Sequence, residues 1–212
     1  MRRIAISLRA GIATGCLATL AVVSILPGCA TVPTGPREEL DESTGTTLLI
    51  VQHPLIFARP RVDVAAHTRD YVTLVGTEED RSGRYTAWLV AHRWSTVDPR
   101  MGGQSDASAS LHVIADDREF TLQRTDPPPG FLKRGDLLFA PHAAAAHPDA
   151  YPVDDATLRY IAGASRLLVR VGESDPLPPY ALWDDGREAL LQLVELVPRS
   201  RRPGPARQDS GR

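Results

Sequence analysis

The side chains of the segment Arg84–Ser95 fall into two alternating sets along its whole length. One set of alternate residues is Thr86, Trp88, Val90, His92 and Trp94, and the other is Tyr85, Ala87, Leu89, Ala91 and Arg93. A period of two residues is that of a β-strand, because successive side chains point to opposite faces of a sheet. A long strand of this kind requires partner strands for its backbone hydrogen bonds. The segment therefore predicts a sheet.

Other segments supply candidate partner strands. Apolar, β-branched runs cover residues 46–51 and 70–77, and the second is expected to form a hairpin with Arg84–Ser95 through a loop of moderate length that contains Ser82 and Gly83. A second hairpin is predicted from residues 111–115 and 119–123. Two shorter strands are predicted at residues 137–140 and 166–171.

Two segments have the pattern of helices. Asp154 is placed to cap the first helix, which ends near Gly163. The second begins at Asp184-Asp185, with Glu188 in its first turn. The apolar positions of the two helices are Leu158, Ile161 and Ala162, and then Leu190, Leu193, Val194 and Val197. The prediction is a β-rich α+β domain, either an antiparallel sandwich or a half-open sheet, with two short helices.

The domain is expected to cover residues 46–197, a length usual for one domain. Residues 29–45 contain prolines, glycines and an acidic cluster, and they predict a flexible spacer. Residues 198–212 are rich in arginine and proline and predict a disordered tail.

The amino end has the pattern of a secretory signal. Arg2, Arg3 and Arg9 precede an uncharged apolar run from Ala10 to Leu26. The run is at the short limit for crossing a bilayer core of roughly 30 Å and is interrupted by glycines. A permanent transmembrane helix therefore fits it less well than a signal peptide of residues 1–28.

The end of this run, Leu26-Pro27-Gly28-Cys29, resembles the lipobox of bacterial lipoproteins. The resemblance implies diacylglycerol transfer to the Cys29 thiol, cleavage before Cys29 and acylation of the new amino group. Pro27 departs from the residues usual at that position of the motif. Ala30 lacks the aspartate that favours inner-membrane retention, so the resemblance implies the outer membrane, with the protein facing the periplasm. The alternative is that Cys29 is an ordinary thiol beside another type of signal cleavage site.

The charge and the cysteine content of the mature chain limit the bonds it can form and the partners it can bind. Cys16 is lost with the signal, so Cys29 remains alone and no disulfide within the mature chain is possible. Cleavage before Cys29 also removes three arginines and no acid, which leaves 21 basic residues against 26 acidic ones. An acidic domain of this kind argues against nucleic-acid binding, which depends on cationic residues.

No established motif in the sequence predicts catalysis, a metal site or a cofactor. There is no Gly-x-Ser-x-Gly elbow and no helical pair of histidines at metal-binding spacing. His142, His147 and Asp149 give a weak metal pattern, for which an exposed loop is the better interpretation. A third possibility is an enzyme site assembled from scattered residues such as His92, Asp98 and Asp116.

The leading hypothesis is a membrane-anchored envelope lipoprotein with a structural or protein-interaction role and another envelope protein as its partner. The alternative is a carbohydrate- or small-ligand-binding lipoprotein. Trp88, His92 and Trp94 share one face of a predicted strand, and tryptophans on a sheet face suit sugar or peptide recognition.

Replacing Cys29 by serine is expected to abolish the incorporation of labelled fatty acid, because serine offers no thiol for the lipid. The precursor should stay membrane-bound and unprocessed. Metabolic labelling followed by electrophoresis measures both effects, and Cys16→Ser is the matched control, which should label normally. Unchanged labelling of the Cys29→Ser chain would show that the lipid lies elsewhere.

Overall fold

The computed structural model describes residues 35–42, 44–98, 110–126, 148–172 and 177–200, and the side chains of the last helix as far as residue 196. His142, His147 and the strand predicted at residues 137–140 lie outside these ranges.

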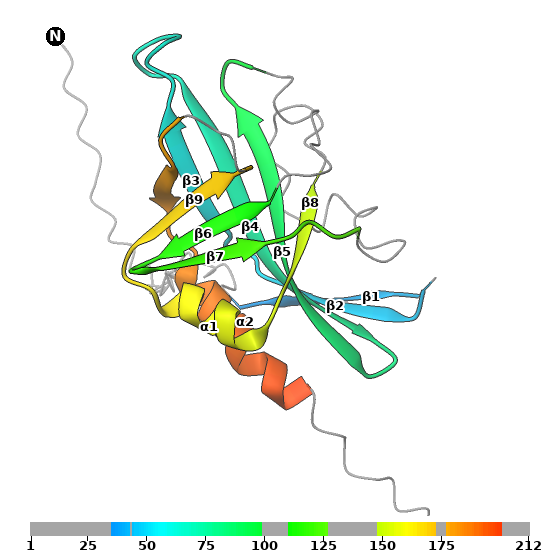
Figure 1. Ribbon diagram of the computed structural model, residues 1–212. Coiled ribbons are helices and arrows are strands. Elements are labelled where there is room, and N and C mark those ends of the chain that lie inside the picture. The colour runs from blue at the N-terminus through cyan, green and yellow to red at the C-terminus, as the bar shows by residue number, and fades with distance from the viewer. Residues whose placement is uncertain (1–34, 43, 99–109, 127–147, 173–176, 201–212) are drawn as a thin grey trace, which may run out of the picture. The chain divides into compact units, whose positions relative to one another are not determined.

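The described strands belong to one antiparallel sheet (Figure 1). They are β1 (Arg37–Asp41), β2 (Thr46–Ile50), β3 (Leu55–Pro60), β4 (Arg69–Arg81), β5 (Arg84–Ser95), β6 (Leu111–Ala115), β7 (Arg118–Leu122), β8 (Asp149–Val153), β9 (Leu167–Val171) and β10 (Tyr180–Asp184). Hydrogen-bonded neighbours follow the order β1-β2-β4-β3-β10-β9-β6-β7, and β5 joins β4 to β8. The fold is therefore α+β, with the half-open sheet of the two predicted alternatives.

Strand β4 is the centre of this sheet. One of its edges is shared: residues 69–74 pair with β3 and residues 77–81 pair with β2. Its other edge pairs with β5 over the whole length of both strands. Between β2 and β3 the chain bends, and the Val51 N–H donates to the carbonyl oxygen of Gly76 at 3.0 Å. The two branches of the sheet thus separate at Gly76.

The predicted hairpin of β4 and β5 is confirmed, but its loop is shorter than expected. The strands extend to Arg81 and Arg84, and only Ser82 and Gly83 connect them. Both residues have positive φ, 56° and 80°, as a two-residue type I′ turn requires. The end of β4 was not predicted as strand because it contains acidic residues, and Glu and Asp are depleted in strands.

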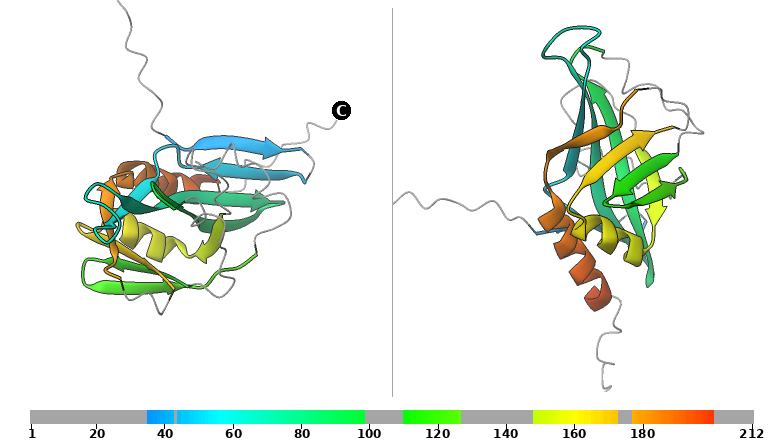
Figure 2. Two further views of the ribbon diagram at one scale, coloured as in Figure 1. Left: turned by 90° about the horizontal axis from the view of Figure 1, so that it is seen from above. Right: turned by 60° about the vertical axis from the view of Figure 1, so that its left-hand side comes forward.

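Two helices, α1 (Asp155–Gly163) and α2 (Arg187–Ser200), pack against one face of the sheet, called here the inner face (Figures 1 and 2). As predicted, Asp154 caps α1 by accepting from the Thr157 N–H at 2.8 Å. The Arg187 guanidinium donates to the carbonyl oxygen of Ala164, which places the start of α2 beside the end of α1. The main core includes Leu55, Leu74, Leu89, Leu158, Ile161, Leu190 and Leu193.

The opposite, outer face of the central strands is buried as well. A second apolar cluster comprises Leu48, Ile50, Val75, Trp88, Val90 and Ala150. Both sets of alternate side chains of β5 therefore lie mainly in the interior, which is why this strand is apolar on its two faces.

The structure differs from the predicted boundaries at both ends. Strand β1 lies in the predicted spacer, since an edge strand tolerates the charged side chains that favoured a linker. Helix α2 continues through Pro198 to Ser200, whereas the prediction ended it at residue 197. Strands β3, β8 and β10 were not predicted. Strands β3 and β8 contain prolines, at positions 60 and 152, and in β10 the alternation of side chains is too short to be recognised. Within the described residues, no helix is both long and apolar enough to cross a membrane.

Gly76→Ala is expected to lower the free energy of unfolding by about 1–3 kcal/mol, the usual cost of overpacking a core. A Cβ there would overlap the Leu190 side chain and lie 3.2 Å from Leu193 Cδ2. Gly163→Ala is the matched control, because no atom lies within 4 Å of its added Cβ and alanine favours the helix. Denaturant titration compares the two, and equal stabilities would contradict the role given to Gly76.

Candidate functional site

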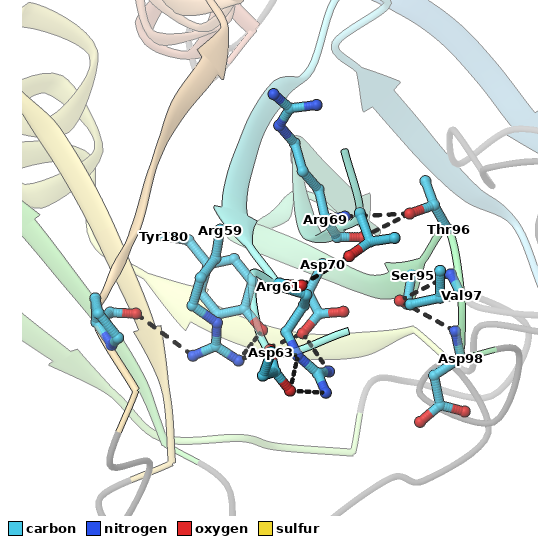
Figure 3. Close-up of polar contacts among 12 residues, drawn as sticks. Arg59, Arg61, Asp63, Arg69, Asp70, Ser95, Thr96, Val97, Asp98 and Tyr180 are labelled. Atoms are coloured by element: carbon cyan, nitrogen blue, oxygen red, sulfur yellow. Dashed lines mark hydrogen bonds and ion pairs between the residues drawn. The ribbon is translucent and has the colours of Figure 1, made fainter. Parts of the chain in front are cut away.

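A buried polar cluster lies at the end of the sheet remote from the two helices (Figure 3). Arg59 on β3 and Asp70 on β4 are direct cross-strand partners on the inner face. Asp70 is 0% exposed, and its Oδ2 lies 3.7 Å from Arg59 Nη2 and 3.1 Å from Arg61 Nη1. The Asp70 carboxylate thus pairs with two guanidinium groups, and Asp63 supplies the second negative charge by pairing with Arg61, so that the charges of the cluster balance.

Arg59 also connects this pair to β10. Its Nη2 donates to the Tyr180 hydroxyl at 2.9 Å, and its guanidinium lies 4.2 Å from the centre of the Tyr180 ring. Its Nη1 donates to the carbonyl oxygen of Pro178 at 3.4 Å. A single side chain therefore links β3, β4 and the segment that enters β10.

Arg61 extends the cluster into the connection between β3 and β4. Its guanidinium binds Asp63 through Nε and Nη2, and its Nη1 reaches Asp70. Hydrogen bonding to Arg61 lowers the pKa of Asp63, and the bonds to Asp63 and Asp70 raise the pKa of Arg61. These ion pairs fix the direction in which the loop leaves the sheet.

A second ion-pair group lies on β5 and β8. Asp149 is buried, with its Oδ1 3.0 Å from Arg124 Nε and its Oδ2 3.8 Å from Arg93 Nη2. The Thr125 N–H donates to the carbonyl oxygen of Ala150 at 3.0 Å, so the segment after β7 is tied to β8. Asp149, one member of the weak metal pattern, is thus held by arginines. The described ranges contain no group of three His, Cys, Asp or Glu residues that could hold a metal ion.

Exposed apolar side chains lie on the loops next to the first cluster. Four exposed side chains, called here the loop-end surface, lie on the segments that leave β3, leave β5 and enter β10: Val62, Val64, Val97 and Leu177. Val62 is 79% exposed. The Thr96 hydroxyl donates to the Arg69 carbonyl at 3.2 Å, which ties the segment of Val97 to the beginning of β4. Exposed apolar side chains thus lie on loops that adjoin a buried polar cluster.

Trp88, His92 and Trp94, the aromatic residues predicted to bind a ligand, lie on the outer face. Trp88 and His92 are buried, and Trp94 stacks on Tyr71 with ring centres 4.0 Å apart. The Trp94 indole N–H donates to Thr73 Oγ1 at 3.1 Å. Their role in ligand binding stays a prediction, and any ligand would have to enter the interior of the protein to meet Trp88 or His92.

His92 is 1% exposed, and neither of its ring nitrogens has a hydrogen-bond partner in the part of the chain that the structure describes. Burial disfavours the charged imidazolium and lowers the pKa of His92 to about 4. On the same face, burial raises the pKa of Glu79, and the Trp88 indole opposes this effect. The outer face therefore favours the neutral forms of both side chains.

Ser110, His112 and Glu119 form a hydrogen-bonded chain that sequence reasoning missed. Ser110 Oγ lies 2.9 Å from His112 Nε2, and His112 Nδ1 lies 2.9 Å from Glu119 Oε1. The order of atoms is that of a hydrolase triad. The exposure is the reverse, since the serine is 2% exposed and the glutamate side chain 47% exposed. A nucleophile must reach its substrate, so this chain suits cross-strand support of the β6–β7 hairpin.

Asp98 and Asp116, the other two residues of the possible enzyme site, lie in different parts of the structure. Asp116 occupies the β6–β7 turn with φ 51° and accepts from the N–H groups of Ser165 and Arg166. Asp98 follows β5, and its N–H donates to Ser95 Oγ at 3.2 Å. Neither has a hydrogen bond or ion pair with His92 among the described contacts, in which the ring nitrogens of His92 stay unpaired.

No protein family, curated protein or solved structure matches this chain.

His92→Leu is expected to weaken the acid sensitivity of the fold. Folding holds His92 neutral with a pKa of about 4, whereas an unfolded histidine binds a proton below about pH 6.5. Stability is therefore lost as the pH falls from about 6.5 to about 4, by about 3 kcal/mol in total.

Denaturant titrations across this pH range measure the effect, with His53→Leu as the control, because His53 is partly exposed and lies 3.1 Å from Asp184. The control should keep the acid sensitivity of the wild type over this window. An equally steep loss in His92→Leu would contradict the assignment.

Proposed function

We propose that this chain is an envelope lipoprotein, anchored through Cys29 in the outer membrane and facing the periplasm, whose folded domain binds another envelope protein. The loop-end surface is the proposed docking site. The observation that carries the proposal is that Val62, Val64, Val97 and Leu177 are all exposed on loops at one end of the sheet. Clustered exposed apolar side chains mark sites of protein interaction, whereas single ones need no explanation.

The buried cluster next to this surface supports the proposal. Arg59 and Arg61 converge on Asp70, and Arg59 also holds the carbonyl of Pro178, next to Leu177. Two of the apolar segments are therefore fixed relative to each other before any partner binds. Fixed segments lose less conformational freedom on binding, and this loss is one of the main costs of association.

Trp183 and Arg69 add a second group of side chains near the same end. Trp183 on β10 is exposed, and the Arg69 guanidinium lies 4.5 Å from the centre of its ring. Tryptophan and arginine are enriched among the residues that carry most of the binding energy in protein interfaces. A partner that buries the loop-end surface would find this pair at its rim.

The proposal is tested by photo-crosslinking in cells. An unnatural photoreactive residue at position 62 is expected to yield a reproducible crosslink to one envelope protein, identified by mass spectrometry. The same residue at position 40 is the matched control, because Leu40 is exposed on β1 at the other branch of the sheet. Position 40 should not yield that product.

The double substitution Val62→Asp and Val64→Asp should reduce capture from position 97 at least about tenfold, since two charges would be desolvated in the interface. Leu40→Asp should leave this capture unchanged. Equal capture from positions 40 and 62, or capture that survives the double substitution, would overturn the proposal.

A further inference from the structure

Two hollows meet at Tyr85, at the end of the sheet where the β4–β5 hairpin turns. The larger, about 630 Å³, lies between the hairpin, the end of β8 and the start of α1. The smaller, about 160 Å³, lies over β1, β2 and β4 on the inner face. Tyr85 lines both, and the two neighbouring hollows together are called here the hairpin groove.

Among the described residues that line the hairpin groove there are five acids and no arginine or lysine. Its walls combine apolar side chains with five carboxylates: Glu38, Glu78, Asp80, Asp154 and Asp155. Hydrogen bonds from the Thr157 N–H and hydroxyl lower the pKa of Asp154 and so favour its ionised form. The apolar part of the floor includes Leu49, Ala87 and Val153. A segment that fits must carry positive charge on an extended chain with some apolar stem, and arginine has both.

The end of α2 lies near this groove. Arg187 at the start of α2 is bonded to Ala164, just after the end of α1. The two helices run in opposite directions, so the last turn of α2 lies on the side where α1 begins (Figures 1 and 2). Asp154 and Asp155, at that beginning, line the larger hollow. Along the inner face, Leu190 and Leu193 lie against Gly76, two residues before Glu78.

The sequence that follows α2 carries charge opposite to that of the carboxylates in the groove. Residues 201–212 contain Arg201, Arg202, Arg207 and Arg212, with Asp209 as their single acid. Twelve extended residues reach about 40 Å.

We propose that residues 201–212 bind in the hairpin groove of the same molecule, with their arginines on its carboxylates. The groove supplies carboxylates from both walls, and a guanidinium binds a carboxylate through two parallel hydrogen bonds. Attachment at the end of α2 makes binding intramolecular, with an effective concentration in the millimolar range. Ion pairs that are individually weak are then sufficient to keep residues 201–212 in the groove. The groove lies at the opposite end of the sheet from the loop-end surface, so this proposal stands independently of the proposed function.

The test places a photoreactive residue at position 206 of the full chain and maps the products by mass spectrometry. The expected crosslinks fall on the groove, at Tyr85, Leu49 or Val153. The double variant Glu38→Gln, Asp80→Asn should reduce these products about fivefold, and 0.5 M salt should do the same by screening. Asp117→Asn with Glu119→Gln is the matched control, because it removes two acids from the β6–β7 hairpin and should leave the products unchanged.

A mixture of isotopically light and heavy chains separates binding within a molecule from binding between molecules. Only light–light and heavy–heavy products are expected. Mixed products, crosslinks to lipid or to another protein in place of the groove, or equal yields from the two double variants would each overturn the proposal.

Discussion

The sheet depends on one constraint, the need of β4 to satisfy the backbone groups along both of its edges. β5 covers one edge completely, and β2 and β3 divide the other at Gly76. The division sends one branch of the sheet towards β1 and the other through β10 to β7. Because Gly76 has no side chain, Leu190 and Leu193 of α2 can pack at this point of separation. The helix therefore packs at the point where the sheet divides, through a close approach that a Cβ would prevent.

The split also creates two chemically different ends. Beyond the helices, the inner face changes from leucines to the ion pairs of Arg59, Arg61 and Asp70. Buried ion pairs contribute little net stability, because desolvation offsets their attraction. Their effect here is geometric, since Arg59 joins strands that are distant in the sequence. At the hairpin end the carboxylates line an open groove. A single sheet thus presents exposed apolar side chains next to a buried polar cluster at one end and an acidic groove at the other.

Much of the fold could be predicted from local pattern. Strand β5, the β6–β7 hairpin and α1 with its Asp154 cap follow from periodicity and capping, and they occupy the predicted residues within one or two positions. Strand β1 could not be predicted, because its charged sequence has the composition of a linker and is stable only as an edge partner of β2. The candidate site was not predictable either. The register of the strands brings together Arg59, Asp70 and Tyr180, and no spacing in the sequence records that contact.

The sequence by itself determined the period of the long strand, the caps of the first helix and the pattern of the amino end, because these depend on residues close together in the chain. It also predicted that Trp88, His92 and Trp94 share one face. Only the tertiary structure decided that this face is buried, since burial depends on what packs against it. The same holds for the choice between a sandwich and a half-open sheet. The half-open sheet results from the pairing of both β2 and β3 with β4, and these contacts join residues that are far apart in the sequence.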